Sequence, residues 1–171
     1  MRALSILLAG ALALTAASCE RGAAPDKATQ AAVFKHDLPE DVSGYYIPTT
    51  ALQVGDWRLH HLFMGQVPDF MAWRDGQRTA GFAPIMMEFE AGDKTRRTRL
   101  IPTAYDVTET RVRFQATSRD LGAVSFEGRL DQDALATARR NLGDQGVVLK
   151  GTLKVGGRTF DGVSMRWWAG D

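Results

Sequence analysis

The sequence predicts a mainly β fold: an antiparallel β-barrel or β-sandwich of about seven or eight strands, with one α-helix near residues 132–142. Apolar and polar residues alternate with a period of two in most segments beyond residue 41, as in strands with one buried face. A Gly–Gly pair at 156–157 is typical of a tight hairpin turn. With 171 residues, 44% of them hydrophobic, the chain can form one domain with a single core.

The first half of the folded part contains the less regular predicted strands. Proline lacks the backbone N–H that a central strand needs, and glycine weakens a strand, so both residues predict where strands end. The predicted breaks are Pro48, Gly65, Pro68, Gly92 and Pro102. The strands between them are expected at 44–47, 56–64, 84–90 and 97–105, and a short helix is considered at 67–74.

The second half carries the clearest alternation. Three consecutive segments place apolar side chains on one face: Val112, Phe114 and Ala116; Val124, Phe126 and Leu130; and Leu149, Leu153 and Val155. The turn at Gly156-Gly157 then predicts a hairpin with a last strand at 158–168. Gly162 breaks the alternation in that strand, which indicates a β-bulge, and Val163, Met165 and Trp167 return to the buried face.

One segment has helical rather than strand spacing. Asp131 can cap it, Leu135, Ala138 and Leu142 form an apolar stripe, and Gly143 can end it. Two arginines at 139–140 suit the negative C-terminal end of a helix dipole. These signals predict the helix at 132–142.

The N-terminus indicates export. A positive residue, Arg2, precedes about fifteen mostly apolar residues, which is shorter than the roughly 20 that a membrane-spanning helix needs. The following Ala16-Ala17-Ser18-Cys19 resembles the lipobox of bacterial lipoproteins, in which the cysteine becomes lipidated. The predicted organisation is a signal peptide at 1–18, a flexible tether at 19–40 and one β-rich domain at 41–171, with cleavage of an ordinary secretion signal as the alternative.

The lipoprotein resemblance also implies a location and a partner. The partner is the membrane, reached through lipid on Cys19. In that family an aspartate directly after the cysteine retains the protein at the inner membrane. Glu20 stands there in this chain, so the resemblance implies an outer-membrane lipoprotein that faces the periplasm.

A second resemblance concerns the folded part. Gly55-Asp56-Trp57 looks like the Gly-x-Trp motif of lipocalins, in which the tryptophan packs beneath a C-terminal arginine at one end of an eight-stranded barrel. Arg166 is the residue that would take the arginine's place. This resemblance implies a ligand-binding barrel.

Charge and motifs exclude several classes of function. The net charge of +1 gives no electrostatic reason to expect a nucleic-acid partner. Neither a serine-nucleophile motif nor a glycine-rich phosphate loop is present, so no catalytic residue and no cofactor are predicted. The carboxylates of Asp69, Glu88 and Glu90 are interpreted as solvated strand faces and loop ends.

The adjacent pair His60-His61 is the first candidate for chemistry. Neighbouring residues on a regular strand point to opposite faces, so the pair is not expected to bind one metal ion. His61 falls in phase with Trp57 and Leu59, which favours a position in the core or at its rim. The third histidine, His36, is expected in the tether.

The remaining candidates are aromatic or apolar. The segment 63–73 carries few charges and either lines a pocket or plugs the core. The candidate ligand-binding residues are Trp57, His61, Phe70, Met71 and Trp73, and Trp168 is a candidate interaction surface. The sequence therefore favours a lipid-anchored periplasmic module that binds a small apolar ligand or an envelope protein. The alternatives are an envelope hydrolase and a structural accessory of an envelope complex.

Overall fold

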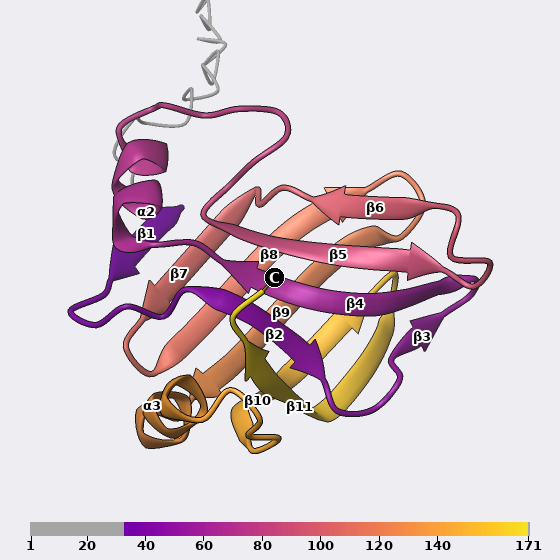
Figure 1. Cartoon of the computed structure of the whole chain (residues 1–171). Coiled ribbons are helices and arrows are strands. Elements are labelled where there is room, and N and C mark those ends of the chain that lie inside the picture. The colour runs from indigo at the N-terminus through magenta and orange to yellow at the C-terminus, as the bar shows by residue number, and fades with distance from the viewer. Residues whose placement is uncertain (1–32, 171) are drawn as a thin grey trace, which may run out of the picture.

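The computed structural model describes residues 33–170, which form one curled, open β-sheet and two helices (Figure 1). The mainly β prediction is confirmed, but the strands outnumber the predicted seven or eight. They are β1 (Phe34–Asp37), β2 (Gly44–Pro48), β3 (Gln53–Val54), β4 (Trp57–Met64), β5 (Ile85–Ala91), β6 (Arg97–Leu100), β7 (Ala104–Thr108), β8 (Arg111–Ser118), β9 (Gly122–Leu130), β10 (Val147–Val155) and β11 (Arg158–Trp168).

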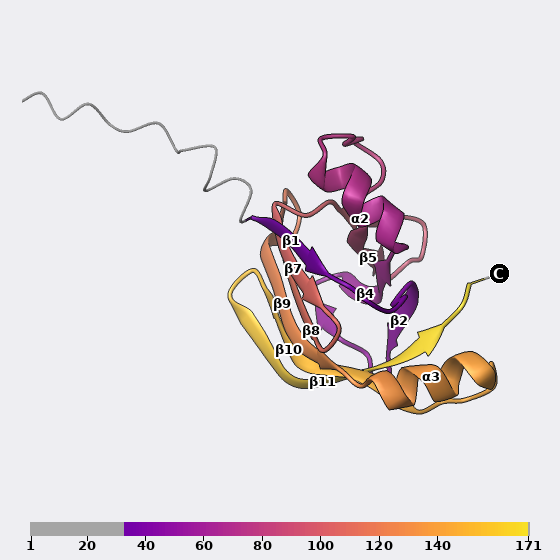
Figure 2. The same cartoon turned by 90° about the vertical axis from the view of Figure 1, so that its left-hand side faces the viewer.

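The sheet order is β1-β7-β8-β9-β10-β11-β2-β4-β5-β6, and β3 pairs with β4. Strands β7 to β11 follow one another as a meander, and β11 then pairs antiparallel with β2 near the start of the chain. The sheet therefore curls like a barrel wall but stays open, with β6 at one edge and β1, parallel to β7, at the other. Figure 2 shows this curl from the side.

The inner face of the curl holds the core. Large side chains with under 2% of their surface exposed fill it, including Tyr46, Phe70, Phe89, Phe114 and Phe126. Helix α2 (Val67–Arg74) contributes Phe70 and Trp73, whose rings lie 5.5 Å from Tyr105 and 6.2 Å from Phe34 respectively. The helix therefore packs against β1 and β7 at the open side of the sheet.

The short-range predictions for the second half are confirmed. Both glycines of the turn at 156–157 have positive φ, which L-residues rarely adopt. Gly162 also has a positive φ of 66°, and the register of β10 with β11 shifts there, as a bulge requires. Val163 and Met165 are buried.

Both helices obey local capping rules. In α3 (Gln132–Arg140), the Asp131 carboxylate accepts from the Ala134 amide at 3.0 Å. Leu142 lies beyond the last turn and is 72% exposed, so it is not part of the apolar stripe. Helix α2 forms at 67–74, and the Asp69 carboxylate accepts a hydrogen bond from the backbone N–H of Gln66 at 2.8 Å.

The observed strands differ from the predicted ones in three places. The strand expected at 97–105 is two strands, β6 and β7, because Pro102 between them cannot donate to a ladder. Strand β3 was not predicted. Strand β1 lies inside the predicted tether at 19–40, so the sheet begins at Phe34 rather than near Asp41; its parallel pairing with β7 involves residues distant in sequence.

The predicted signal peptide at 1–18, Cys19 and the tether up to residue 32 lie outside the described residues. Among residues 33–170, no helix is long and apolar enough to span a membrane. The contact expected from the lipocalin motif takes a different form, since the guanidinium above the Trp57 ring belongs to Arg96, 5.3 Å from the ring centre, and not to Arg166.

Candidate functional site

A β-bulge in β4 places two histidines on the same face of the sheet. Leu59 pairs with Phe89 and His61 pairs with Glu88, so His60 is an extra residue without a partner on β5. Leu59 and Leu62 on either side of the pair are both buried, while His60 and His61 both point to the outer face. The prediction that they lie on opposite faces, with His61 on the core side, is wrong because the bulge interrupts the strand period.

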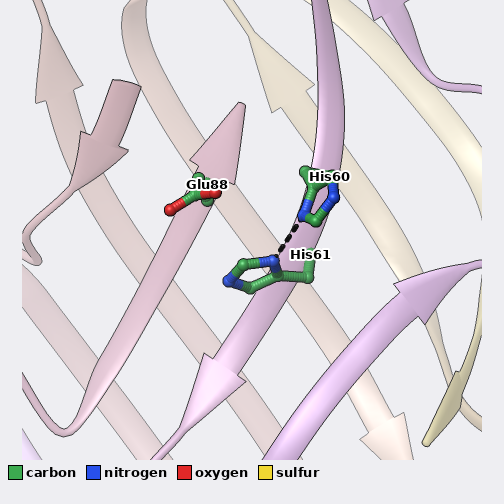
Figure 3. A group of neighbouring side chains, drawn as sticks. All are labelled: His60, His61 and Glu88. Atoms are coloured by element: carbon green, nitrogen blue, oxygen red, sulfur yellow. Dashed lines mark hydrogen bonds between the residues drawn. The ribbon is translucent and has the colours of Figure 1, made fainter. Parts of the chain in front are cut away.

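The two imidazoles touch. Their Nδ1 atoms lie 2.7 Å apart, so one ring donates and the other accepts a hydrogen bond (Figure 3). Glu88 projects from β5 beside them, and one ligand atom from each of the three residues lies within 4.8 Å of the others. Two imidazoles and a carboxylate are a donor set that divalent transition metals prefer.

Salt bridges hold this carboxylate in place. The Glu88 oxygens accept from Arg97 at 3.1 Å and Arg99 at 3.2 Å, while Glu90 accepts from Arg97 at 3.2 Å and Arg58 at 2.9 Å. Both glutamates are only 5% exposed, whereas the arginine side chains are about half exposed. We call these five residues the ion-pair ladder. The interpretation of Glu88 and Glu90 as solvated carboxylates is therefore wrong.

At neutral pH His61 is neutral and Glu90 of the ladder is charged. Burial lowers the pKa of His61 to about 4, although Glu88 beside it acts in the opposite direction. The further charges that face this ring belong to His60, Arg97 and Arg99, and all of them lower its pKa. The His61 ring is therefore neutral at neutral pH and keeps a nitrogen lone pair. The hydrogen bond from Arg58 similarly lowers the pKa of Glu90, which stays ionised.

A row of aromatic rings continues the site across the neighbouring strands. Trp168 pairs with Tyr45, and Tyr45 pairs with Phe63, in register from β11 through β2 to β4. Their ring centres are 5.4 and 5.3 Å apart, and Phe82 lies 6.0 Å from Phe63. We call these four residues the aromatic row. The His61 ring stands edge-on to Tyr45 at 4.9 Å, so it joins the row to the ion-pair ladder.

These groups line an outer pocket of about 440 Å³. Its wall contains the whole aromatic row, Met86, both histidines and Glu88, with Arg97 and Arg99 at one side. Another hollow of about 620 Å³ lies over β8, β9 and β10, where the exposed pair Arg113 and Glu127 is prominent. The outer pocket differs in combining stacked rings, two imidazoles and a buried carboxylate. It can hold an apolar or planar group, orient an anion and supply metal ligands.

The structure separates the predicted site residues. His61 and Trp168 both line the outer pocket. Phe70 and Trp73 belong to the core, and Met71 is 46% exposed on the opposite side of α2. Trp57 packs partly against the core. Helix α2 at 67–74 therefore covers the open side of the sheet, whereas Phe63 from the same predicted segment lines the outer pocket. Phe70, Met71 and Trp73 are not among the residues that line that pocket.

His36 also lies away from its expected place. It belongs to β1, where its ring centre is 5.6 Å from that of Phe70, and burial lowers its pKa. It is not one of the residues that line the outer pocket.

Sequence reasoning missed most of this site. Tyr45, Phe63 and Trp168 come from three strands, and only the pairing of β2 with β11 brings them together. A signal for the ladder was present, because Glu88-Phe89-Glu90 and Arg97-Thr98-Arg99 each repeat one charge at a spacing of two, on segments joined by a short turn.

The comparisons with known proteins add no relative. The chain matches no protein-family model, no curated protein sequence and no solved structure.

Proposed function

We propose that this chain is a lipid-anchored protein of the bacterial envelope whose folded part is a binding module, with the outer pocket as its ligand site. The observation that carries the proposal is the meeting of the aromatic row and the ion-pair ladder at one pocket of about 440 Å³. Binding sites are typically concave, largely apolar and provided with a few polar groups that orient the ligand.

The charges and rings favour a small ligand that combines a planar apolar body with an acidic group. The ladder has three arginines against two glutamates, and burial keeps His61 neutral, so the local excess is one positive charge. The arginine side chains are about half exposed and remain accessible to a carboxylate or sulfonate. Stacked rings beside them offer apolar area at little cost in side-chain entropy.

The anchor is proposed from the lipobox-like residues before Cys19, which lie outside the described part of the chain. Replacing Cys19 with alanine should prevent lipidation and move the protein from the detergent phase to the aqueous phase on phase partitioning. A variant that still partitions fully into detergent would refute the anchor. The proposed location is the periplasmic face of the outer membrane.

An anilinonaphthalene sulfonate dye is a direct probe of the pocket, because it joins fused aromatic rings to a sulfonate. Fluorescence titration of the folded full chain should give saturable binding to one site. Trp168→Ala and Arg99→Gln should each weaken it about tenfold, which corresponds to 1.4 kcal/mol. The matched controls Leu142→Ala and Arg140→Gln change an exposed apolar residue and an arginine elsewhere, and should leave it unchanged. Equal binding by all four variants would contradict the proposal.

One observation favours an envelope hydrolase as a second candidate: a histidine and a carboxylate meet in the pocket. A general base works best when its pKa lies near the working pH, whereas burial lowers the pKa of His61 to about 4. Glu88 is also held by two arginines. The binding module therefore remains the better supported function.

A further inference from the structure

We propose that His60, His61 and Glu88 bind one divalent transition-metal ion, of the class represented by Zn²⁺, at the floor of the outer pocket. This goes beyond the proposed function, which concerns an organic ligand and the lipid anchor. The proposal stands on the bulge in β4, on the contact between the two imidazoles and on the position of a buried carboxylate.

The bulge supplies the first argument. A regular strand would send neighbouring histidines to opposite faces, but the extra residue in β4 turns both toward β5. Bulges often re-aim side chains at functional sites, and this one places two adjacent histidines opposite a single glutamate.

The distances supply the second argument. The two Nδ1 atoms are already 2.7 Å apart, and the three ligand atoms lie within 4.8 Å of one another. Zinc binds imidazole nitrogen at about 2.0–2.1 Å, so a tetrahedral ion separates two such nitrogens by about 3.3 Å. The rings need to open by only about 0.6 Å, which a small rotation of each side chain provides. The ring that now donates from Nδ1 would take the tautomer with its proton on Nε2, by exchange with water, so both rings stay neutral and both Nδ1 lone pairs face the ion.

The carboxylate completes the donor set. Each Glu88 oxygen accepts one hydrogen bond from an arginine, and an ionised carboxylate has about four acceptor positions, so a metal ion has room beside these partners. The arginines also hold the carboxylate in a fixed orientation, as residues behind metal ligands commonly do. The positive charge of the arginines repels any metal ion that enters the site. The site should therefore favour an ion that forms strong bonds to imidazole over Mg²⁺ or Ca²⁺, which do not.

Three protein ligands leave a position of a tetrahedral ion open. Because all three residues line the outer pocket, the open position would face the space that the aromatic row borders. A water molecule or the acidic group of a bound ligand would complete the coordination. The ion would thus add to the positive field that the arginines already create.

The test is calorimetric titration of Zn²⁺ into the untagged full chain carrying Cys19→Ser, which removes the competing thiol. We expect one equivalent to bind. His60→Gln and His61→Gln should each weaken binding at least about tenfold. His36→Gln is the matched control because it removes the remaining histidine, away from the pocket, and should bind as the parent does. Glu88→Gln should also weaken binding, whereas Glu127→Gln, which changes an exposed glutamate, should not.

Circular dichroism of each variant separates loss of ligands from loss of fold. Titration with Co²⁺ gives an independent readout on the parent chain, since imidazole ligation changes its visible spectrum. Absence of one-to-one binding by the parent overturns the proposal, as does equal binding by folded His60→Gln and His36→Gln. The dye titration can succeed when the zinc titration fails, so the two proposals are tested separately.

Discussion

Removing one histidine of the adjacent pair tests whether the β-bulge brings this site together. Deleting either residue produces the same chain, in which one histidine stands between Leu59 and Leu62. In the parent chain, the bulge places two residues of β4 opposite Glu88. In the deletion variant one residue of β4 lies opposite Glu88, and both leucines stay on the inner face. The main loss is the hydrogen bond between the rings, which contributes about 1 kcal/mol to stability.

Deleting Phe63 from the same strand is the matched control, because it removes one residue from regular pairing. It turns the fully buried Met64 to the outer face, and burial of such a side chain contributes about 1.5–3 kcal/mol. It also removes ring contacts with Tyr45 at 5.3 Å and Phe82 at 6.0 Å, each contributing about 0.5–1.5 kcal/mol. The expected decrease in the free energy of unfolding is about 2.5–6 kcal/mol.

Urea unfolding followed by tryptophan fluorescence measures both variants. The single-histidine chain should keep the denaturant slope of the parent and lose about 1 kcal/mol. The same chain should also lose zinc binding while it remains folded. If its stability falls as far as that of the Phe63 deletion, the assignment of the bulge is refuted.

Two further perturbations follow from the structure. Gly151→Ala should lower the free energy of unfolding by about 2–3 kcal/mol, because the added Cβ would lie 2.7 Å from the Gly128 Cα on the neighbouring strand. The control Gly143→Ala would place its Cβ no nearer than 3.6 Å to another residue, so it should change the free energy of unfolding in urea by less than about 0.5 kcal/mol. Acid should also destabilise the fold, because between pH 6.5 and about 4 the unfolded chain binds a proton at His61 that the folded chain does not. Allowing for partial exposure of the ring, the loss is about 1–3 kcal/mol as the pH falls through that range, and His61→Gln should flatten the pH profile of the unfolding free energy.

The elements that could be predicted are those whose signals are local. The hairpin after β10 was predictable from two adjacent glycines that accept positive φ. Helix α3 was predictable from Asp131 at its start and from the helical spacing of Leu135 and Ala138. The bulge at Gly162 was predictable because it lies in a strand with otherwise clear alternation. The bulge in β4 carries no glycine, so strict alternation put His61 on the wrong face.

Amphipathic alternation by itself determined that this chain forms antiparallel strands with one buried face, because the side on which a residue lies depends on its nearest neighbours along the chain. The site depended on which strands pair. The pairing of β11 with β2 assembles the aromatic row, and the register of β4, β5 and β6 aligns the histidines, glutamates and arginines. Only the tertiary structure decided that β11 meets β2 and that β4 meets β5, because these pairings join residues far apart in sequence through ladder hydrogen bonds and core packing that no local pattern specifies. The arginines of β6, by contrast, are one short turn from the glutamates of β5.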